Sequence, residues 1–247
     1  MSYSGAFAGF YDQLTEEIDY QQRARYFDEI IRQHVAVTGE TILLDLACGT
    51  GSLSVALSGL GYDVIGVDGS ADMLSEAVSK GSAGRQILYL CQPFERLDLF
   101  GTIDVAVCAL DSINHMTDLA TVEKTFEKVS LFTVPGGLFV FDVNTEYKHR
   151  QVLGDNTFVY DLDDVYCVWQ NTTDETLLTE ITLDFFVRRG KTYTRESENF
   201  CERAYTHEQL CGVLGKTGYE LLAVYEGDTF EPVGETAQRA VYVARKK

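Results

Sequence analysis

The sequence predicts an α/β protein built on a doubly wound β-sheet, and three observations support this. Short runs rich in Val, Ile and Leu alternate with amphipathic stretches over residues 41–144. Strands that are apolar on both faces indicate a sheet covered by helices on both sides. A glycine turn follows the first run, at residues 45–51, and beyond about residue 150 the helical patterns give way to segments rich in Thr, Tyr, Phe and Val. That last change indicates an antiparallel insertion.

Each element of the main sheet follows from local patterns. Apolar spacings of three and four predict one helix over residues 6–36. The expected strands, seven in all, are residues 41–47, 63–68, 86–91, 103–110, 138–144, 219–225 and 240–247. The expected helices between them are residues 52–61, 70–81, 118–133 and 206–218. Ser70 and Thr206 are expected as N-caps, because their hydroxyls accept free backbone N–H groups, and Pro135–Gly137 is expected as a turn.

The pattern divides the chain into three parts. Residues 1–38 are an N-terminal helical segment, residues 39–153 and 205–247 form the main α/β domain, and residues 154–204 are the antiparallel β insertion after the fifth strand. Gly190 marks a hairpin turn inside the insertion.

Composition excludes several classes of function. A net charge of −18, from 20 basic and 38 acidic residues, disfavours nucleic acid as a partner. No apolar run is long enough for a membrane span, and the N-terminus has no signal-peptide pattern. The six cysteines lack metal-ligand spacing, so we expect reduced thiols, no metal site and a cytoplasmic location.

The glycine turn, Asp-Leu-Ala-Cys-Gly-Thr-Gly, indicates a small-molecule site. Gly49 and Gly51 let a ligand approach the main chain, and the next helix offers free N–H groups there. The dinucleotide pattern G-x-G-x-x-G is incomplete, and Asp45 would repel a pyrophosphate. Both observations disfavour a dinucleotide, and an NAD(P)-dependent oxidoreductase is kept only as the alternative. An acid at this place favours a ligand with an ammonium group.

The stretch Leu-Leu-Asp-Leu-Ala-Cys-Gly-Thr-Gly resembles the first motif of the class I S-adenosylmethionine-dependent methyltransferases, with Ala47 in place of the first glycine. Asp68 ends the second strand, where that family has a carboxylate that accepts hydrogen bonds from both ribose hydroxyls. The resemblance is clear over residues 40–150. It implies the class I methyltransferase fold, S-adenosylmethionine as cofactor, and in-line transfer of a methyl group to N or O of a small-molecule acceptor. The cofactor-binding residues it implies are Tyr11, Asp45, Ala47, Gly49, Gly51, Asp68, Gly69, Met73, Gln92, Pro93, Phe94 and Leu110.

The third motif departs from the family pattern. Gln92, Pro93 and Phe94 stand where the family often has an acid that binds the adenine amino group. Adenine recognition by this segment and a plain strand-to-loop turn both remain open.

The loop after the fourth strand is expected to face the methyl group. Asp-Ser-x-Asn-His, residues 111–115, is similar to a loop of small-molecule methyltransferases and differs from the loop of nucleic-acid amino methyltransferases. Asp111, Asn114 and His115 are the candidate catalytic residues. His115 is either a general base or a helix cap. Asp111 orients an acceptor amine, touches the methionine end of the cofactor or caps a turn.

The N-terminal residues Phe7, Ala8, Tyr11 and Asp12 match a family pattern in which a lid helix folds over the cofactor. Tyr11 would reach the methionine portion with Tyr20 nearby; the alternative is that both rings pack in the core. The insertion resembles that of sugar-amine and glycine N-methyltransferases, where it forms the floor of the acceptor pocket or a homodimer contact. A regulatory protein that binds the cofactor without transfer remains the second alternative.

Overall fold

The computed structural model describes the backbone of residues 5–247 and the side chains from Ala8 onward. The strands are β1 (Ile42–Leu46), β2 (Asp63–Asp68), β3 (Leu88–Cys91), β4 (Ile103–Cys108), β5 (Thr133–Asn144), β6 (Thr157–Asp161), β7 (Val165–Thr173), β8 (Leu178–Arg189), β9 (Thr192–Arg203), β10 (Tyr219–Glu226) and β11 (Arg239–Lys246). The helices are α1 (Gly5–Leu14), α2 (Tyr20–Arg32), α3 (Ser52–Gly59), α4 (Ala71–Lys80), α5 (Leu119–Phe132) and α6 (His207–Lys216), with the short helical turns η1 (Phe94–Arg96) and η2 (Lys148–Leu153).

Two sheets make up the described part of the chain. The large sheet has seven strands in the order β10–β11–β5–β4–β1–β2–β3, and the small sheet has four antiparallel strands in the order β6–β7–β8–β9. Strands β1 to β5 run parallel, and β11 is antiparallel to both of its neighbours, β5 and β10. The chain passes from β1 outward to β2 and β3 and then returns to β4 on the other side of β1, which confirms the predicted doubly wound order. In such sheets ligands bind at the carboxyl ends of the strands, beside this reversal.

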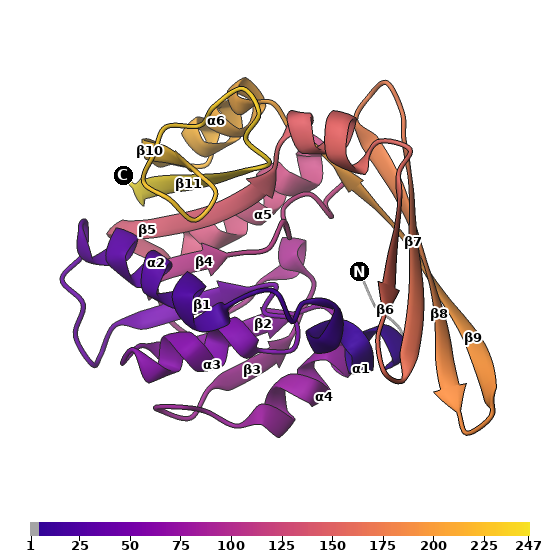
Figure 1. Cartoon of the computed structure of the whole chain (residues 1–247). Coiled ribbons are helices and arrows are strands. Elements are labelled where there is room, and N and C mark those ends of the chain that lie inside the picture. Colours follow the sequence, from indigo (N-terminus) through magenta and orange to yellow (C-terminus); the bar gives the residue numbers. More distant parts are fainter. Residues whose placement is uncertain (1–4) are drawn as a thin grey trace.

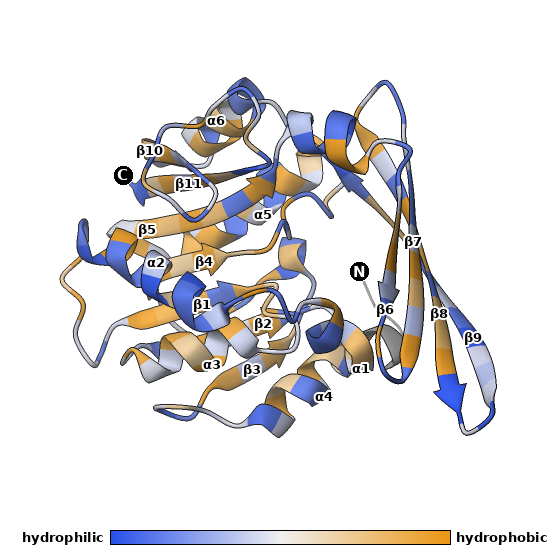
Figure 2. Cartoon of the chain, in the orientation of Figure 1, coloured by the Kyte–Doolittle hydropathy of each residue, from blue (hydrophilic) through white to orange (hydrophobic). Residues whose placement is uncertain are grey.

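The large sheet is apolar on both faces and helices cover both (Figure 1 and Figure 2). On one face Phe27 and Ile30 of α2 join α3 residues in a buried cluster. On the other face Phe126 of α5 and Leu210 of α6 do the same. The strands are almost continuously apolar in the sequence because helices bury them from both sides.

The small sheet faces the carboxyl edge of the large sheet, with α1 beside it (Figure 1). The ring of Phe10 stacks on Phe185 of β8 at 6.4 Å between centroids, and Ala8, Met73 and Cys167 pack in the same apolar cluster. The insertion thus forms a wall opposite the strand ends where a ligand is expected. No helix of the described residues is long and apolar enough to cross a membrane.

Two local predictions were wrong. The expected single helix over residues 6–36 is two helices, because the Asp19 carboxylate accepts a hydrogen bond from the Gln22 N–H at 2.8 Å and begins α2 afresh. The expected turn at Pro135–Gly137 is a bulge within β5, where the pairing passes from Ile103–Thr133 to Val105–Leu138. The expected caps Ser70 and Thr206 are confirmed by hydrogen bonds to the N–H groups of Met73 and Gln209.

Candidate active site

The glycine turn joins β1 to α3, and its two glycines serve different purposes. Both have left-handed backbone angles, with φ of 53° at Gly49 and 74° at Gly51. A Cβ added at Gly49 would meet nothing within 4 Å, whereas one at Gly51 would lie 2.5 Å from the Tyr89 hydroxyl. Gly49 therefore borders open space that a ligand can approach, and Gly51 is required by packing. Ala47, which replaces the first glycine of the family motif, also has a positive φ of 63°, at a cost of about 1–2 kcal/mol.

Alanine at these two glycines is expected to have different effects. Gly51→Ala should lower the free energy of unfolding by about 2–3 kcal/mol, because backbone strain adds to a clash in a packed site. Gly49→Ala should cost only the backbone strain, about 1–2 kcal/mol, but should weaken cofactor binding more. Urea unfolding and calorimetric titration with S-adenosylhomocysteine measure the two effects. Equal loss of stability in both variants would contradict this assignment.

Asp68 ends β2 beside the glycine turn. One carboxylate oxygen accepts the Gly49 N–H at 2.9 Å and the other accepts the Ser70 N–H at 2.8 Å. Burial raises its pKa, and these two bonds oppose that shift. The Gly69 N–H also bonds to this carboxylate. A carboxylate can accept about four hydrogen bonds, so the group is held in place and can still accept a hydrogen bond from a ligand. Gly69 lies between Asp68 and the cap of α4.

Asp45 lies below the turn and is buried. Burial raises the pKa of Asp45 to about 7, the Ser54 hydroxyl opposes the shift with a hydrogen bond of 2.5 Å, and the charge of Asp68 adds to it. Among the described residues no cation lies within ion-pair distance of its carboxylate. A buried acid in this state suits a ligand with a positive charge, which is the charge of the expected cofactor.

Helix α1 covers this region, as expected of a lid. Asp12 accepts a hydrogen bond from the Thr50 hydroxyl at 2.7 Å and pairs with Lys80 of α4 at 2.5 Å. Tyr11 and Tyr20 close a cavity of about 30 Å³, room for roughly one or two water molecules. Its other lining residues are Asp45, Ala47, Cys48, Gly49, Thr50, Ser52, Leu53, Ala109, Leu110 and Ser112. Helix α2, in contrast, packs on the large sheet. The side chain of Phe7 lies outside the described part of the chain.

The third-motif segment is a compact loop beside Asp68. The Gln92 side chain donates to the Asp98 carbonyl at 3.0 Å and accepts the Asp98 N–H at 2.9 Å. Pro93 precedes the turn η1, and Phe94 packs against the core. The Gln92 amide is therefore used within the loop itself.

The loop after β4 is held in a strained conformation. Leu110 and Asp111 have φ of 58° and 54°, and their N–H groups donate to the two carboxylate oxygens of Asp142 at 2.9 and 2.7 Å. Asp142 also pairs with Arg239 at 2.6 Å and with Arg23 at 3.2 Å. Arg239 pairs in turn with Asp111 at 2.8 Å. Asp142, Arg23 and Arg239 were missed by the sequence analysis.

Asn114 is buried, and its amide joins three segments of backbone. It donates to the carbonyls of Asn144 and Arg203 at 3.1 and 2.9 Å and accepts the Asn144 N–H at 2.8 Å. Its side chain holds the loop against the ends of β5 and β9. We therefore propose a positioning role for Asn114 and no contact with the acceptor.

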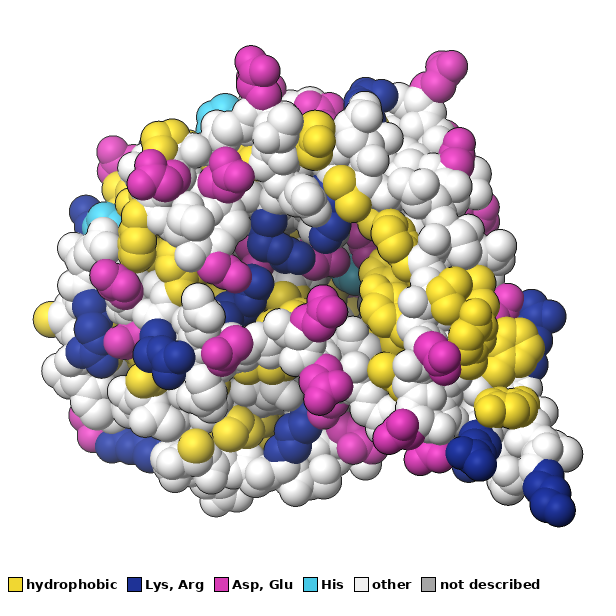
Figure 3. Space-filling model, viewed as in Figure 1, with side chains coloured by type: hydrophobic (Ala, Val, Ile, Leu, Met, Phe, Trp, Pro, Cys, Tyr) yellow, Lys and Arg dark blue, Asp and Glu magenta, His cyan; other side chains and the backbone are white. Residues whose placement is uncertain are grey.

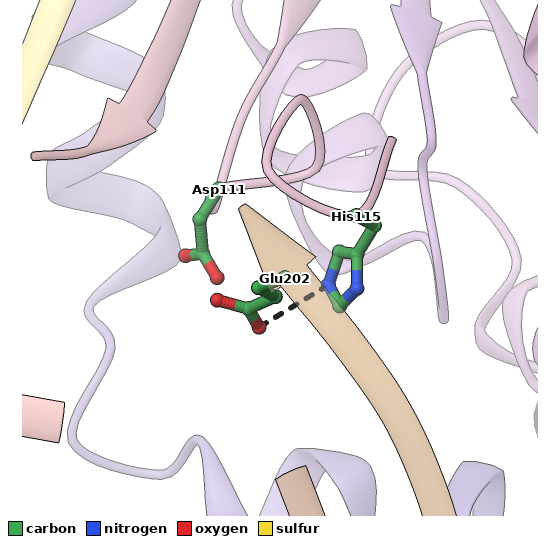
Figure 4. A group of neighbouring side chains, drawn as sticks. All are labelled: Asp111, His115 and Glu202. Carbon is green, nitrogen blue, oxygen red and sulfur yellow. Dashed lines mark ion pairs between the residues drawn. The ribbon is translucent and has the colours of Figure 1, made fainter. Parts of the chain in front are cut away.

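Asp111, His115 and Glu202 point toward one another (Figure 4). His115 Nε2 lies 3.7 Å from Glu202 Oε1, and one oxygen or nitrogen of each residue lies within 4.8 Å of the other two. Helix α5 is capped by Asp118, so His115 is not its cap. Glu202, from the end of β9 in the insertion, was missed because nothing near it in the sequence marks it.

Burial and charge set the protonation of this group. Burial lowers the pKa of His115 and, together with the charge of Asp111, raises that of Glu202. Burial opposes ionisation of Asp111, but the charges of Arg239 and Lys148 hold its pKa well below the usual value. Near neutral pH the group therefore holds an ionised Asp111, a neutral imidazole and a Glu202 that retains its proton.

We call the space bounded by Asp111, His115, Lys148, Glu202 and Arg239 the acceptor hollow. Figure 3 shows a recess between the large and small sheets in which Lys and Arg, Asp and Glu, and His side chains gather. Among the aromatic side chains of the insertion, the ring of Phe200 lies 5.3 Å from that of His115 between centroids, whereas Trp169 packs against Phe158 and Tyr160. Tyr166 and Tyr193 are exposed, and Arg195 lies 6.0 Å above the ring of Phe186.

Comparison with known proteins identifies the family. Residues 43–137 match the family described as a methyltransferase domain. A Bacillus subtilis (strain 168) protein, YqeM, whose name describes it as a methyltransferase, is 32% identical and is matched over 100% of this chain and 98% of its own length. The crystal structure of an S-adenosylmethionine-dependent methyltransferase from Clostridium acetobutylicum ATCC 824 has 34% identity and a TM-score of 0.88, with 98% of each chain covered.

A glycine/sarcosine N-methyltransferase from Halorhodospira halochloris is 33% identical over 137 residues, 54% of this chain and 51% of its own. These similarities give no support to the oxidoreductase or to a protein without transfer activity. The chain belongs to the class I S-adenosylmethionine-dependent methyltransferases.

Proposed function

We propose that the enzyme transfers the methyl group of S-adenosylmethionine to an amine nitrogen of a small molecule bound in the acceptor hollow. The observation that carries this proposal is the group of Asp111, His115 and Glu202 at the carboxyl edge of the large sheet, next to the glycine turn. A carboxylate attracts an ammonium group, and a neutral imidazole can take its proton. The partial similarity to a glycine/sarcosine N-methyltransferase supports an amine acceptor.

The residues around the glycine turn fit the cofactor. Asp68 presents two fixed oxygens for the ribose diol, Asp45 presents a buried acid for the positive charge of the amino acid portion, and Gly49 leaves room for close approach. When bound, the cofactor supplies a methyl group on a positively charged sulfur. Helix α1, which lies over the glycine turn, keeps water away from this methyl group.

On the acceptor side, the protein has to orient the nitrogen and remove a proton. Asp111 is fixed by Arg239 and by the strained loop, so it can hold an ammonium in one orientation. His115 then accepts a proton from that nitrogen, whose free lone pair attacks the methyl carbon in line. Alignment contributes about 7–11 kcal/mol in such reactions, so positioning carries most of the rate and the base a smaller part.

Transfer from radiolabelled S-adenosylmethionine tests nitrogen against oxygen. Glycine and glycolate share a carboxylate and differ in the amine or hydroxyl at the reacting position. We expect labelled product with glycine or a larger primary amine, and none with the hydroxy analogue of each amine. Labelling of the hydroxy analogues alone would overturn the assignment to nitrogen.

Cofactor affinity is expected to fall below about pH 7. In the free enzyme the pKa of Asp45 is raised to about 7, and a bound cation would lower it, so binding at lower pH must displace a proton. Affinity should therefore fall by up to about tenfold per pH unit below 7 and be flat above it. Calorimetry with S-adenosylhomocysteine from pH 5.5 to 8.5 measures this. Asp45→Asn, which removes the titrating group, is the control and should bind weakly at every pH; an unchanged slope in that variant would contradict the prediction.

A further inference from the structure

Basic side chains gather in the acceptor hollow although the chain as a whole is acidic. The net charge is −18 with only 20 basic residues, yet Arg23, Arg239 and Lys148 all lie around Asp142 and Asp111. Figure 3 shows Lys and Arg side chains inside the recess. A cation that is withdrawn from solvent needs a counter-ion, so the partners of each one are informative.

The two arginines have counter-ions in the protein. Arg239 pairs with Asp111 and Asp142 at 2.8 and 2.6 Å. Arg23 pairs with Asp142 and Asp228 at 3.2 and 2.8 Å. The charges of both arginines are therefore already compensated by carboxylates, and these ion pairs hold the loop after β4 in place.

Lys148 differs from both. Its ammonium donates to Asn144 Oδ1 at 2.9 Å, and no carboxylate of the described residues lies within 4.0 Å of it. An ammonium has three donors, so two have no acceptor in the described part of the chain. Burial lowers the pKa of Lys148, and the charge of Asp111 opposes that shift. Glu202 offers little compensation, because its own pKa is raised.

We propose that Lys148 binds an anionic oxygen group of the acceptor, a carboxylate or a phosphate, while the acceptor nitrogen faces Asp111 and His115. Lys148 begins η2, between the end of β5 and the small sheet, so it can hold the far end of a molecule whose amine lies at the loop after β4. The acceptor is then an amine with an acidic group, and the negative charge elsewhere on the protein disfavours anions without such a site. The placement of the acceptor nitrogen rests on the proposed function, whereas the binding of the anionic group to Lys148 does not.

Binding of inorganic phosphate and of acetate to the enzyme saturated with S-adenosylhomocysteine tests the site without any transfer. We expect at least one anion to bind at millimolar concentration, and Lys148→Met to weaken it about tenfold or more, the loss of one bond to a charged group. Lys148→Arg should keep most of the affinity. Lys216→Met, which removes a surface lysine paired with Glu123, is the matched control and should bind as the unaltered enzyme does.

The two anions distinguish the sources of the charge. Preference for phosphate indicates a phosphorylated acceptor and preference for acetate a carboxylate. Failure of both to bind, or equal binding by Lys148→Met, overturns the proposal. Because the affinity for S-adenosylhomocysteine is measured in the same samples, a folding defect is recognised separately. Failure of the nitrogen assignment appears only in the transfer assay.

Discussion

Replacement of Asp68 by alanine is expected to weaken binding of S-adenosylhomocysteine by at least about 100-fold. The carboxylate would accept two hydrogen bonds from the ribose, and bonds to charged groups contribute about 1.5–3 kcal/mol each, so about 3 kcal/mol or more is lost. The variant also loses the bonds that fix the Gly49 and Ser70 N–H groups. Titration calorimetry gives the affinity directly, and methyl transfer should fall with it at low cofactor concentration.

Asp72→Ala provides the matched control, because Asp72 is an exposed acid in the first turn of α4, four residues further on. It should bind the cofactor within about twofold of the unaltered enzyme, since an exposed charge contributes little. Asp68→Asn keeps the shape and should lie between the two. If Asp68→Ala and Asp72→Ala bound equally well, the ribose would have to be held elsewhere.

The sequence was sufficient for the large sheet because its strands are buried on both faces. The runs at β1, β2 and β4 are apolar apart from one or two aspartates each. Turns or caps follow them that the side chains themselves specify, as Ser70 does for α4. The glycine turn is local in the same sense, since its residues are consecutive. The strands of the large sheet and the glycine turn were therefore predicted correctly, because each is specified by residues that are neighbours in the sequence.

Local information also explains the errors. The periodicity of residues 6–36 continues across the break between α1 and α2, and only the cap at Asp19 marks the new start. The groups that complete the acceptor hollow are brought together by topology. Arg239 lies beside Asn144 because β11 pairs antiparallel with β5, and Glu202 arrives at the end of β9. A search for charged residues at the ends of paired strands would have found Arg239, but not its partners.

Asp142 connects the fold to the chemistry. Two consecutive left-handed residues, Leu110 and Asp111, cost about 1–2 kcal/mol each, and the Asp142 carboxylate offsets that cost by accepting both N–H groups. The same carboxylate orders Arg239, which orients Asp111. In the function proposed above, this strain presents the side chain of Asp111 to the acceptor; strained backbone is common at functional sites.

Asp142→Ala is expected to lower the free energy of unfolding by about 3–5 kcal/mol, because it removes the partner that Arg23 and Arg239 share in a buried site and leaves two N–H groups unpaired. With a total stability above about 5 kcal/mol, inside the usual range of about 5–15 kcal/mol, the variant stays folded without denaturant, with the loop after β4 released. Urea unfolding measures the loss, and turnover should fall while cofactor affinity changes less. Asp228→Ala removes the other, half-exposed partner of Arg23 and should cost about 1 kcal/mol or less. A loss in Asp142→Ala no larger than in Asp228→Ala would mean that the loop holds its conformation without this carboxylate, and Asp111 would then owe its orientation to Arg239 alone.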